Sequence, residues 1–111
     1  MSRPAEIERR AMSDGSELVS TTILLPSGWN KPETIVHFVL PTAYPSAQPD
    51  CFFADVDLRL ADGAMPTNAG FQSLDGREML WFSWHLSSWS PAIDNVETYV
   101  RFIERRFHHA R

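Results

Sequence analysis

Two stretches in the first half of the chain alternate between apolar and polar positions. In residues 17–25 the alternate positions on one face are Val19, Thr21, Ile23 and Leu25. Residues 34–40 repeat the pattern, with Ile35, His37 and Val39 on one face. A period of two with many β-branched residues predicts strands. The loop between them carries a glycine and two prolines, so we expect an antiparallel pair.

The segment after the second strand is stiffened by proline. Residues 40–49 hold Pro41, Pro45 and Pro49 together with Tyr44. Proline fixes φ and has no N–H, and it pushes the preceding residue out of the helical region. We therefore expect a rigid, non-helical connector that leads into a third strand over residues 51–56.

Turn-forming residues dominate the next part of the chain. Residues 61–78 contain two Asp-Gly pairs, at Asp62 and Asp75, and are predicted to form a loop. Eighteen residues without regular structure are unusual in a compact domain and are often functional. A short aromatic strand is predicted over residues 79–84.

A helix is predicted to begin at Ser90-Pro91. Serine is a good N-cap, and proline fits the first helical position. An apolar stripe then recurs at helical spacing, as expected for a face turned to the core; its members are Ile93, Val96, Val100, Ile103 and Phe107.

The order of these elements predicts an α+β domain. Strands clustered before a helix favour an antiparallel β-meander of about four strands, with the C-terminal helix packed on one face. Residues 1–16 are predicted to be an arm or to hold a short helix near residues 5–11. Residues 17–111 are predicted to form a single domain.

Composition narrows the classes of function. The chain has 111 residues, a net charge of −4 and one cysteine. The acidic balance argues against a nucleic-acid partner. No apolar run approaches the roughly 18 residues of a membrane span, so no membrane association is expected. A lone cysteine permits no intrachain disulfide; with no signal peptide in evidence, it favours the cytoplasm.

Two motifs resemble those of a known family. Pro41-Thr42-x-Tyr44-Pro45, completed by Pro49, looks like the Pro-x-x-Tyr-Pro turn of ubiquitin-conjugating enzymes. Trp89-Ser90-Pro91-Ala92 resembles the segment that opens a helix shortly after the catalytic cysteine in that family. Both motifs stand in the family order. The compact chain, together with residues 58–63 and 82–85, is most similar to the bacterial branch of the superfamily.

The resemblance implies a UBC-like fold and partners. Relatives are encoded near ubiquitin-like, activating-enzyme-like and metalloprotease-like proteins, so we expect a ubiquitin-like protein and an activating-enzyme-like protein as partners. No metal or organic cofactor is implied. The family cysteine lies eight residues before the motif tryptophan, and Trp81 occupies that position here. The family His-Pro-Asn motif is absent, and Pro66-Thr67-Asn68 is its nearest counterpart.

Ser83 and His85 are the candidate catalytic pair. On an extended strand they share a face, with Cα atoms about 7 Å apart. An imidazole can take the proton that makes a serine hydroxyl nucleophilic. Ser83 would then carry the acyl group as an oxyester, with His85 as base and Asn68 stabilising the oxyanion. The competing interpretation is an ordinary serine and histidine in a hydrogen-bonded surface loop.

Other reactive or aromatic residues have simpler explanations. Cys51, next to two phenylalanines, fits a buried strand residue better than a nucleophile. His108 and His109 are adjacent on a helix and do not face each other, so they fit a solvated helix end better than a metal site. Trp81 and Trp84 are compatible with either a binding platform or the core.

The sequence leaves open one function that does not depend on the fold, a small structural subunit of a larger complex with exposed aromatic residues as its interface, and two functions that follow from the resemblance. One is a ubiquitin-conjugating-enzyme-like transferase of a bacterial modification system, which accepts and passes on the acyl C-terminus of a ubiquitin-like protein through a serine oxyester. The alternative is a catalytically inactive adaptor of the same fold that binds a ubiquitin-like protein or an activating enzyme.

Overall fold

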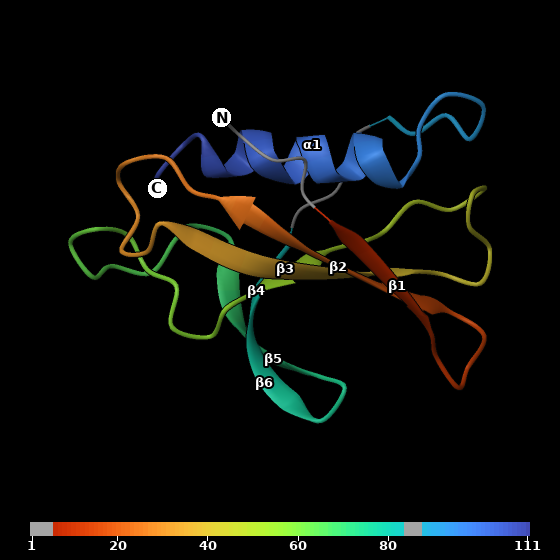
Figure 1. The fold of residues 1–111 in the computed structure, drawn as a ribbon, viewed down its shortest axis with the longest axis horizontal. Helices are drawn as coiled ribbons and strands as arrows, with labels where there is room; N and C mark the ends of the chain where they lie inside the picture. The colour runs from red at the N-terminus through yellow and green to blue at the C-terminus, as the bar shows by residue number, and fades with distance from the viewer. Residues whose placement is uncertain (1–5, 84–87) are drawn as a thin grey trace.

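A computed structural model describes residues 6–83 and 88–111 of the chain. Over these residues the chain forms a six-stranded antiparallel sheet and a single helix (Figure 1). The elements are β1 (Ile7–Ala11), β2 (Glu17–Leu24), β3 (Glu33–Leu40), β4 (Phe52–Ala54), β5 (Ala69–Leu74), β6 (Arg77–Phe82) and α1 (Val96–Phe107). The strand order is β1-β2-β3-β4-β6-β5. The α+β class is confirmed, whereas the expectation of about four strands was wrong.

The first strand replaces the short helix that was one of the predictions for the N-terminal arm. β1 pairs antiparallel with β2, with Ile7 opposite Thr21 and Ala11 opposite Glu17. Its residues are mostly exposed and show no strand periodicity. Pairing with β2 satisfies the β1 backbone and outweighs the weak helical preference of this stretch.

Strands β2 and β3 follow the alternation in the sequence. They pair along their whole length, with Val19 opposite Phe38 and Ile23 opposite Thr34. These residues face α1 and are buried. The face that carries Ile35, His37 and Val39 points away from the helix and is only partly covered. The predicted antiparallel pair is thus correct.

Residues 61–78, predicted to form a loop, instead contain strand β5, the Asp75-Gly76 turn and the first residues of β6. β5 and β6 are joined by Asp75-Gly76, and both turn residues have positive φ values, 51° and 81°. Positive φ at both central positions is typical of the type I′ turn that matches the twist of paired strands. The hairpin projects from the sheet away from α1 (Figure 1).

The helix begins five residues later than predicted. Asn95 is the N-cap: it accepts a hydrogen bond from the Thr98 N–H, and the Thr98 hydroxyl oxygen accepts one from the Asn95 N–H. This reciprocal capping box fixes the start of the helix. Ser90 instead opens a turn, because its carbonyl accepts bonds from the N–H groups of Ile93 and Asp94. Ile93, predicted to lie on the core stripe, is 77% exposed.

One apolar core lies between α1 and the sheet. Phe52 and Phe82 stack at 4.7 Å, and both meet the ring of Phe107 edge-on at 5.6 Å. Trp29 closes one end, and its indole N–H donates to the Phe107 carbonyl at 2.8 Å. The predicted packing of the helix on one face of the sheet is confirmed. None of the described helices is long and apolar enough to cross a membrane.

Candidate functional site

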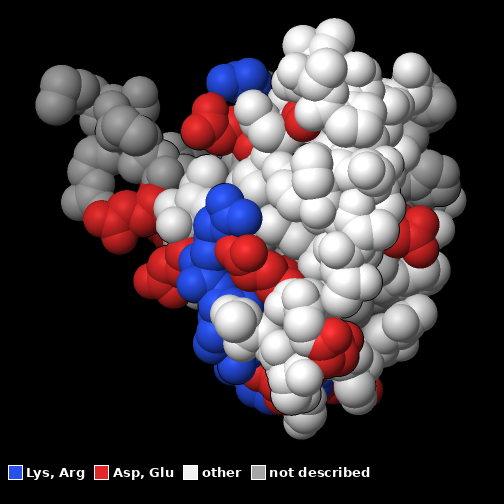
Figure 2. Space-filling model, turned by 90° about the vertical axis from the view of Figure 1, so that its right-hand side faces the viewer, with Lys and Arg blue, Asp and Glu red and all other residues white. Residues whose placement is uncertain are grey.

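The two motifs that carry the family resemblance contact each other. The Trp89 indole N–H donates to the Pro45 carbonyl at 2.8 Å, and the rings of Trp89 and Tyr44 lie 6.3 Å apart. The connector and the segment before α1 are loops on the same side of the molecule (Figure 1). Seen from that side, uncharged residues cover most of the surface, with a strip of mixed charges toward the lower left and scattered acidic side chains elsewhere (Figure 2). The proline connector is therefore fixed to the segment that leads into the helix.

Asn68 and Ser83 lie side by side at one end of the β5–β6 hairpin. The Ser83 N–H donates to the Asn68 carbonyl at 3.0 Å, which extends the β5–β6 ladder by one pair. Both residues are exposed. Asn68 has a φ of 59°, which turns the chain at the start of β5. His85, the third predicted site residue, lies outside the described residues.

Cys51 lies at the same end of the sheet, next to a third strand. It precedes β4, where Phe52 is opposite Phe82. Extending that register by one residue sets Cys51 opposite Ser83, and hence in the same row as Asn68. The sequence did not reveal this row, because the distant strand pairing that creates it has no local signal.

The environment of Cys51 disfavours the thiolate. Cys51 is half-buried, and burial raises the pKa of its thiol, although a side-chain hydrogen bond with Trp81 acts in the opposite direction. A thiol reacts through its thiolate form, so a raised pKa lowers its nucleophilicity at neutral pH. Cys51 is therefore a weaker candidate for acyl transfer than its position alone suggests.

This environment predicts slow alkylation of Cys51. The rate of reaction with iodoacetamide should reach its half-maximum at a higher pH in the folded chain than in the same chain unfolded in urea, because only the folded thiol is partly buried. Mass spectrometry of samples quenched at a series of pH values measures both curves. An equal or lower midpoint in the folded chain would contradict this assignment.

A buried arginine holds the loop that presents Asn68. Arg106, near the end of α1, is 3% exposed and donates to the Thr67 carbonyl at 3.0 Å. Its guanidinium carbon lies 5.3 Å from the ring centroid of Phe82 and 5.9 Å from that of Trp29. The helix thus fixes the residue next to Asn68, which positions one side of the row. Arg106 was not singled out from the sequence, because a contact between residues 67 and 106 has no local signal.

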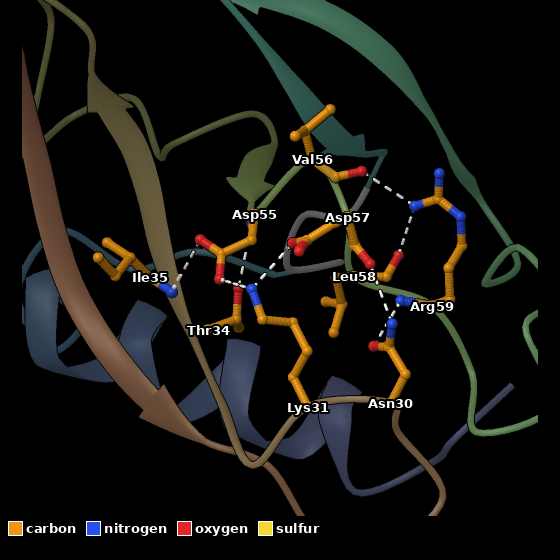
Figure 3. Close-up of polar contacts among 9 residues, drawn as sticks. All are labelled: Asn30, Lys31, Thr34, Ile35, Asp55, Val56, Asp57, Leu58 and Arg59. Atoms are coloured by element: carbon orange, nitrogen blue, oxygen red, sulfur yellow. Dashed lines mark hydrogen bonds and ion pairs between the residues drawn. The ribbon is translucent and has the colours of Figure 1, made fainter.

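A charged cluster lies at the other end of β4. The Lys31 Nζ donates to a carboxylate oxygen of Asp55 at 2.7 Å and to one of Asp57 at 2.8 Å (Figure 3). The hydrogen bond with Lys31 lowers the pKa of Asp57, and the hydrogen bond with Asp55 raises the pKa of Lys31. The nearby Asn30 side chain bonds the backbone of Asp57 and Arg59. These contacts fasten the β2–β3 loop to the segment after β4.

A second serine–histidine pair lies on the sheet face away from α1. The Ser20 hydroxyl and His37 Nδ1 are 2.7 Å apart across β2 and β3. Burial, and then the charge of Arg77, lower the pKa of His37, so the imidazole favours its neutral form. His37 is thus a hydrogen-bonded residue within the sheet. Among the described residues, no group of three His, Cys, Asp or Glu side chains is arranged to hold a metal ion.

Comparison with known proteins identifies the family. The family model described as prokaryotic E2 family E matches residues 4–110. A search of curated proteins and a search of solved structures gave no significant match. The matched region includes every described strand and the helix, together with both motifs and the Cys51–Ser83–Asn68 row. The chain therefore belongs to prokaryotic E2 family E.

Proposed function

We propose that this protein accepts the acyl C-terminus of a ubiquitin-like protein from an activating-enzyme-like protein in the cytoplasm and transfers it to an amine. Ser83 would be the acyl carrier. The observation that supports this role is the position of Ser83: it is exposed, hydrogen-bonded through its backbone to Asn68, and at the open end of the β5–β6 hairpin. The cysteine in the same row is half-buried with a raised pKa.

The proposed chemistry is two acyl transfers. The Ser83 oxygen attacks the carbonyl carbon of the thioester on the activating enzyme, and the C–S bond breaks as the C–O bond forms. The hydroxyl proton passes to His85 and then to the departing sulfur. The Asn68 side-chain amide would donate a hydrogen bond to the oxyanion. In the second transfer an amine attacks the ester, an amide forms, and the Ser83 hydroxyl is restored.

A charging assay tests the carrier. The chain is incubated with its activating enzyme, the ubiquitin-like protein and nucleotide, and adducts are resolved with and without thiol reductant. Wild type should give an adduct that survives reductant and is cleaved by mild alkali, as expected for an oxyester. Ser83→Ala should reduce this adduct to background because the acceptor oxygen is gone.

Matched variants make the result specific. Ser73→Ala removes another exposed hydroxyl of the same hairpin and should charge like wild type. Cys51→Ala should also retain the adduct. Loss of the adduct in Cys51→Ala, together with its retention in Ser83→Ala, would overturn the carrier assignment.

The adaptor remains a second candidate for one reason. Trp81 occupies the position of the family cysteine. It lies in β6 and is paired with Phe53 of β4. A protein without a carrier would bind the ubiquitin-like protein or the charged activating enzyme but form no covalent adduct. In the same assay, full charging of the activating enzyme with stable non-covalent binding and no adduct would favour this function.

A further inference from the structure

The two edges of the sheet are protected very differently. β1, at one edge, contains Glu8, Arg9 and Arg10. β5, at the other edge, reads Ala-Gly-Phe-Gln-Ser-Leu, with no charged residue and no proline. Exposed edge strands are normally protected by charges, prolines or bulges, because their unpaired backbone groups invite another strand. The composition of β5 therefore leaves its edge open to pairing.

The register shows which backbone groups of β5 point outward. The bond from the Ser83 N–H to the Asn68 carbonyl marks a hydrogen-bonded pair. Such pairs alternate with non-hydrogen-bonded pairs along an antiparallel ladder. Ala69, Phe71 and Ser73 therefore lie in non-hydrogen-bonded pairs with β6, so their N–H and C=O groups point away from it. No backbone partner of these three residues occurs on their outer side within residues 6–83 and 88–111.

We propose that the C-terminal tail of the ubiquitin-like protein binds the β5 edge as an added antiparallel strand. This inference rests on the proposed function. An antiparallel strand on β5 runs from Ser73 toward Ala69, so its carboxyl end leaves the sheet beside Asn68 and Ser83. A strand running the other way would carry the carboxyl end to the hairpin turn. The direction of the edge thus selects a C-terminal tail and delivers it to the carrier.

The distances allow the tail to reach Ser83. The added strand is two strand spacings, about 10 Å, from β6. A chain covers about 3.3 Å per residue, so roughly three residues beyond the one opposite Ala69 reach Ser83. Asn68 has a positive φ, which turns the chain just before β5 begins. β5 therefore does not extend along the last part of the path that the tail would take to Ser83.

Phe71 supplies a side-chain anchor in the middle of the edge. Its side chain is 49% exposed, although the Arg59 guanidinium lies 5.4 Å from the ring centroid. In strand addition, backbone bonds give affinity and alternate side chains give specificity. An aromatic residue directly opposite favours an aromatic or β-branched partner. The tail should therefore carry such a residue where it passes Phe71.

The edge can be tested without the acyl transfer. The probe is a synthetic peptide of the last ten residues of the ubiquitin-like protein used in the charging assay, added to the Ser83→Ala chain, which cannot form the ester. Amide hydrogen exchange by NMR should slow at least tenfold at Ala69, Phe71 and Ser73, while inward-facing Gln72 changes little. Binding here with no charging of wild type would overturn the carrier and keep the edge site.

Two edge variants and one control complete the test. Ser73→Pro removes an outward N–H and should weaken peptide binding at least tenfold, whereas Ser73→Ala keeps the N–H and should bind normally. Phe71→Lys adds a protective charge and should also weaken binding, which provides a second route if the proline variant does not fold. Equal binding by all folded variants, or unchanged exchange at the three amides, would overturn the proposal. So would light scattering that shows a dimer through β5 that the peptide does not displace.

Discussion

Phe107→Ala is expected to lower the free energy of unfolding by about 3–5 kcal/mol, the range for deleting a buried aromatic ring. Phe107 has no exposed area and contacts the rings of Trp29, Phe52 and Phe82. These rings come from a loop, two strands and the helix, so the cavity would lie where all of them meet. Small domains have about 5–15 kcal/mol of stability in total, so the variant should be near the limit of folding. Urea denaturation followed by tryptophan fluorescence measures the change.

The same substitution at Phe71 serves as the control. Phe71 is 49% exposed, so Phe71→Ala should cost about 1 kcal/mol or less. Phe107→Leu fills most of the space and should fall between the two alanine variants. Similar losses for both alanine variants would show that the aromatic cluster is not the centre of the core.

Arg106→Met is expected to cost roughly 3 kcal/mol and to loosen the segment that precedes β5. Arg106 donates to the backbone oxygens of Thr67, His109 and Arg111, and hydrogen bonds from a charged group are worth about 1.5–3 kcal/mol each. Methionine keeps much of the apolar contact with the neighbouring rings but restores none of these bonds. Urea denaturation gives the loss of stability, and faster amide exchange at residues 67 and 68 reports the local effect.

Arg105 provides a matched control one residue away. It is exposed, so Arg105→Met should change stability by no more than about 0.5 kcal/mol. Arg106→Lys should recover little, because an ammonium group cannot reproduce the planar set of donors of a guanidinium. If lysine restores full stability, charge rather than the geometry of the hydrogen bonds explains the role of Arg106.

The sequence predicted best where a strong period coincided with burial. β2 and β3 alternate apolar and polar positions because one face of each packs on α1, and the stripe from Val96 to Phe107 reflects the same core from the helix side. Asp75-Gly76 was recognised as a turn. The strand before it was missed, because β5 is exposed on most of its length and carries little apolar periodicity.

The ends of elements were decided by tertiary contacts that the sequence does not display. The local signal at Ser90-Pro91 favours a helix start, yet Trp89 is bonded to Pro45 and Asp94 accepts a hydrogen bond from the Ser90 N–H. The segment is thereby held as a turn, and the helix begins after Asn95. β1 was misread for a similar reason, since its conformation depends on the pairing with β2.

The candidate site was predictable only as separate residues. Ser83 was singled out by its spacing from His85, and Asn68 as the nearest counterpart of the family His-Pro-Asn motif; the structure brings Ser83 and Asn68 together through the β5–β6 ladder. The proximity of Cys51 and the clamp by Arg106 depend on strand order and on a contact between residues 67 and 106, which have no local signature. The catalytic roles themselves stay predictions until the charging assay is done.

The bond between Trp29 and Phe107 also has a consequence for the order of folding. It joins residues 78 positions apart, whereas β1–β2, β2–β3 and β5–β6 pair neighbouring segments. Local hairpins close quickly and distant contacts slowly. During synthesis the hairpins therefore have time to form while the apolar face of the sheet is still without its helix. Until residue 107 has left the ribosome, that apolar face has no helix to cover it, and exposed apolar surface of this kind is prone to aggregation.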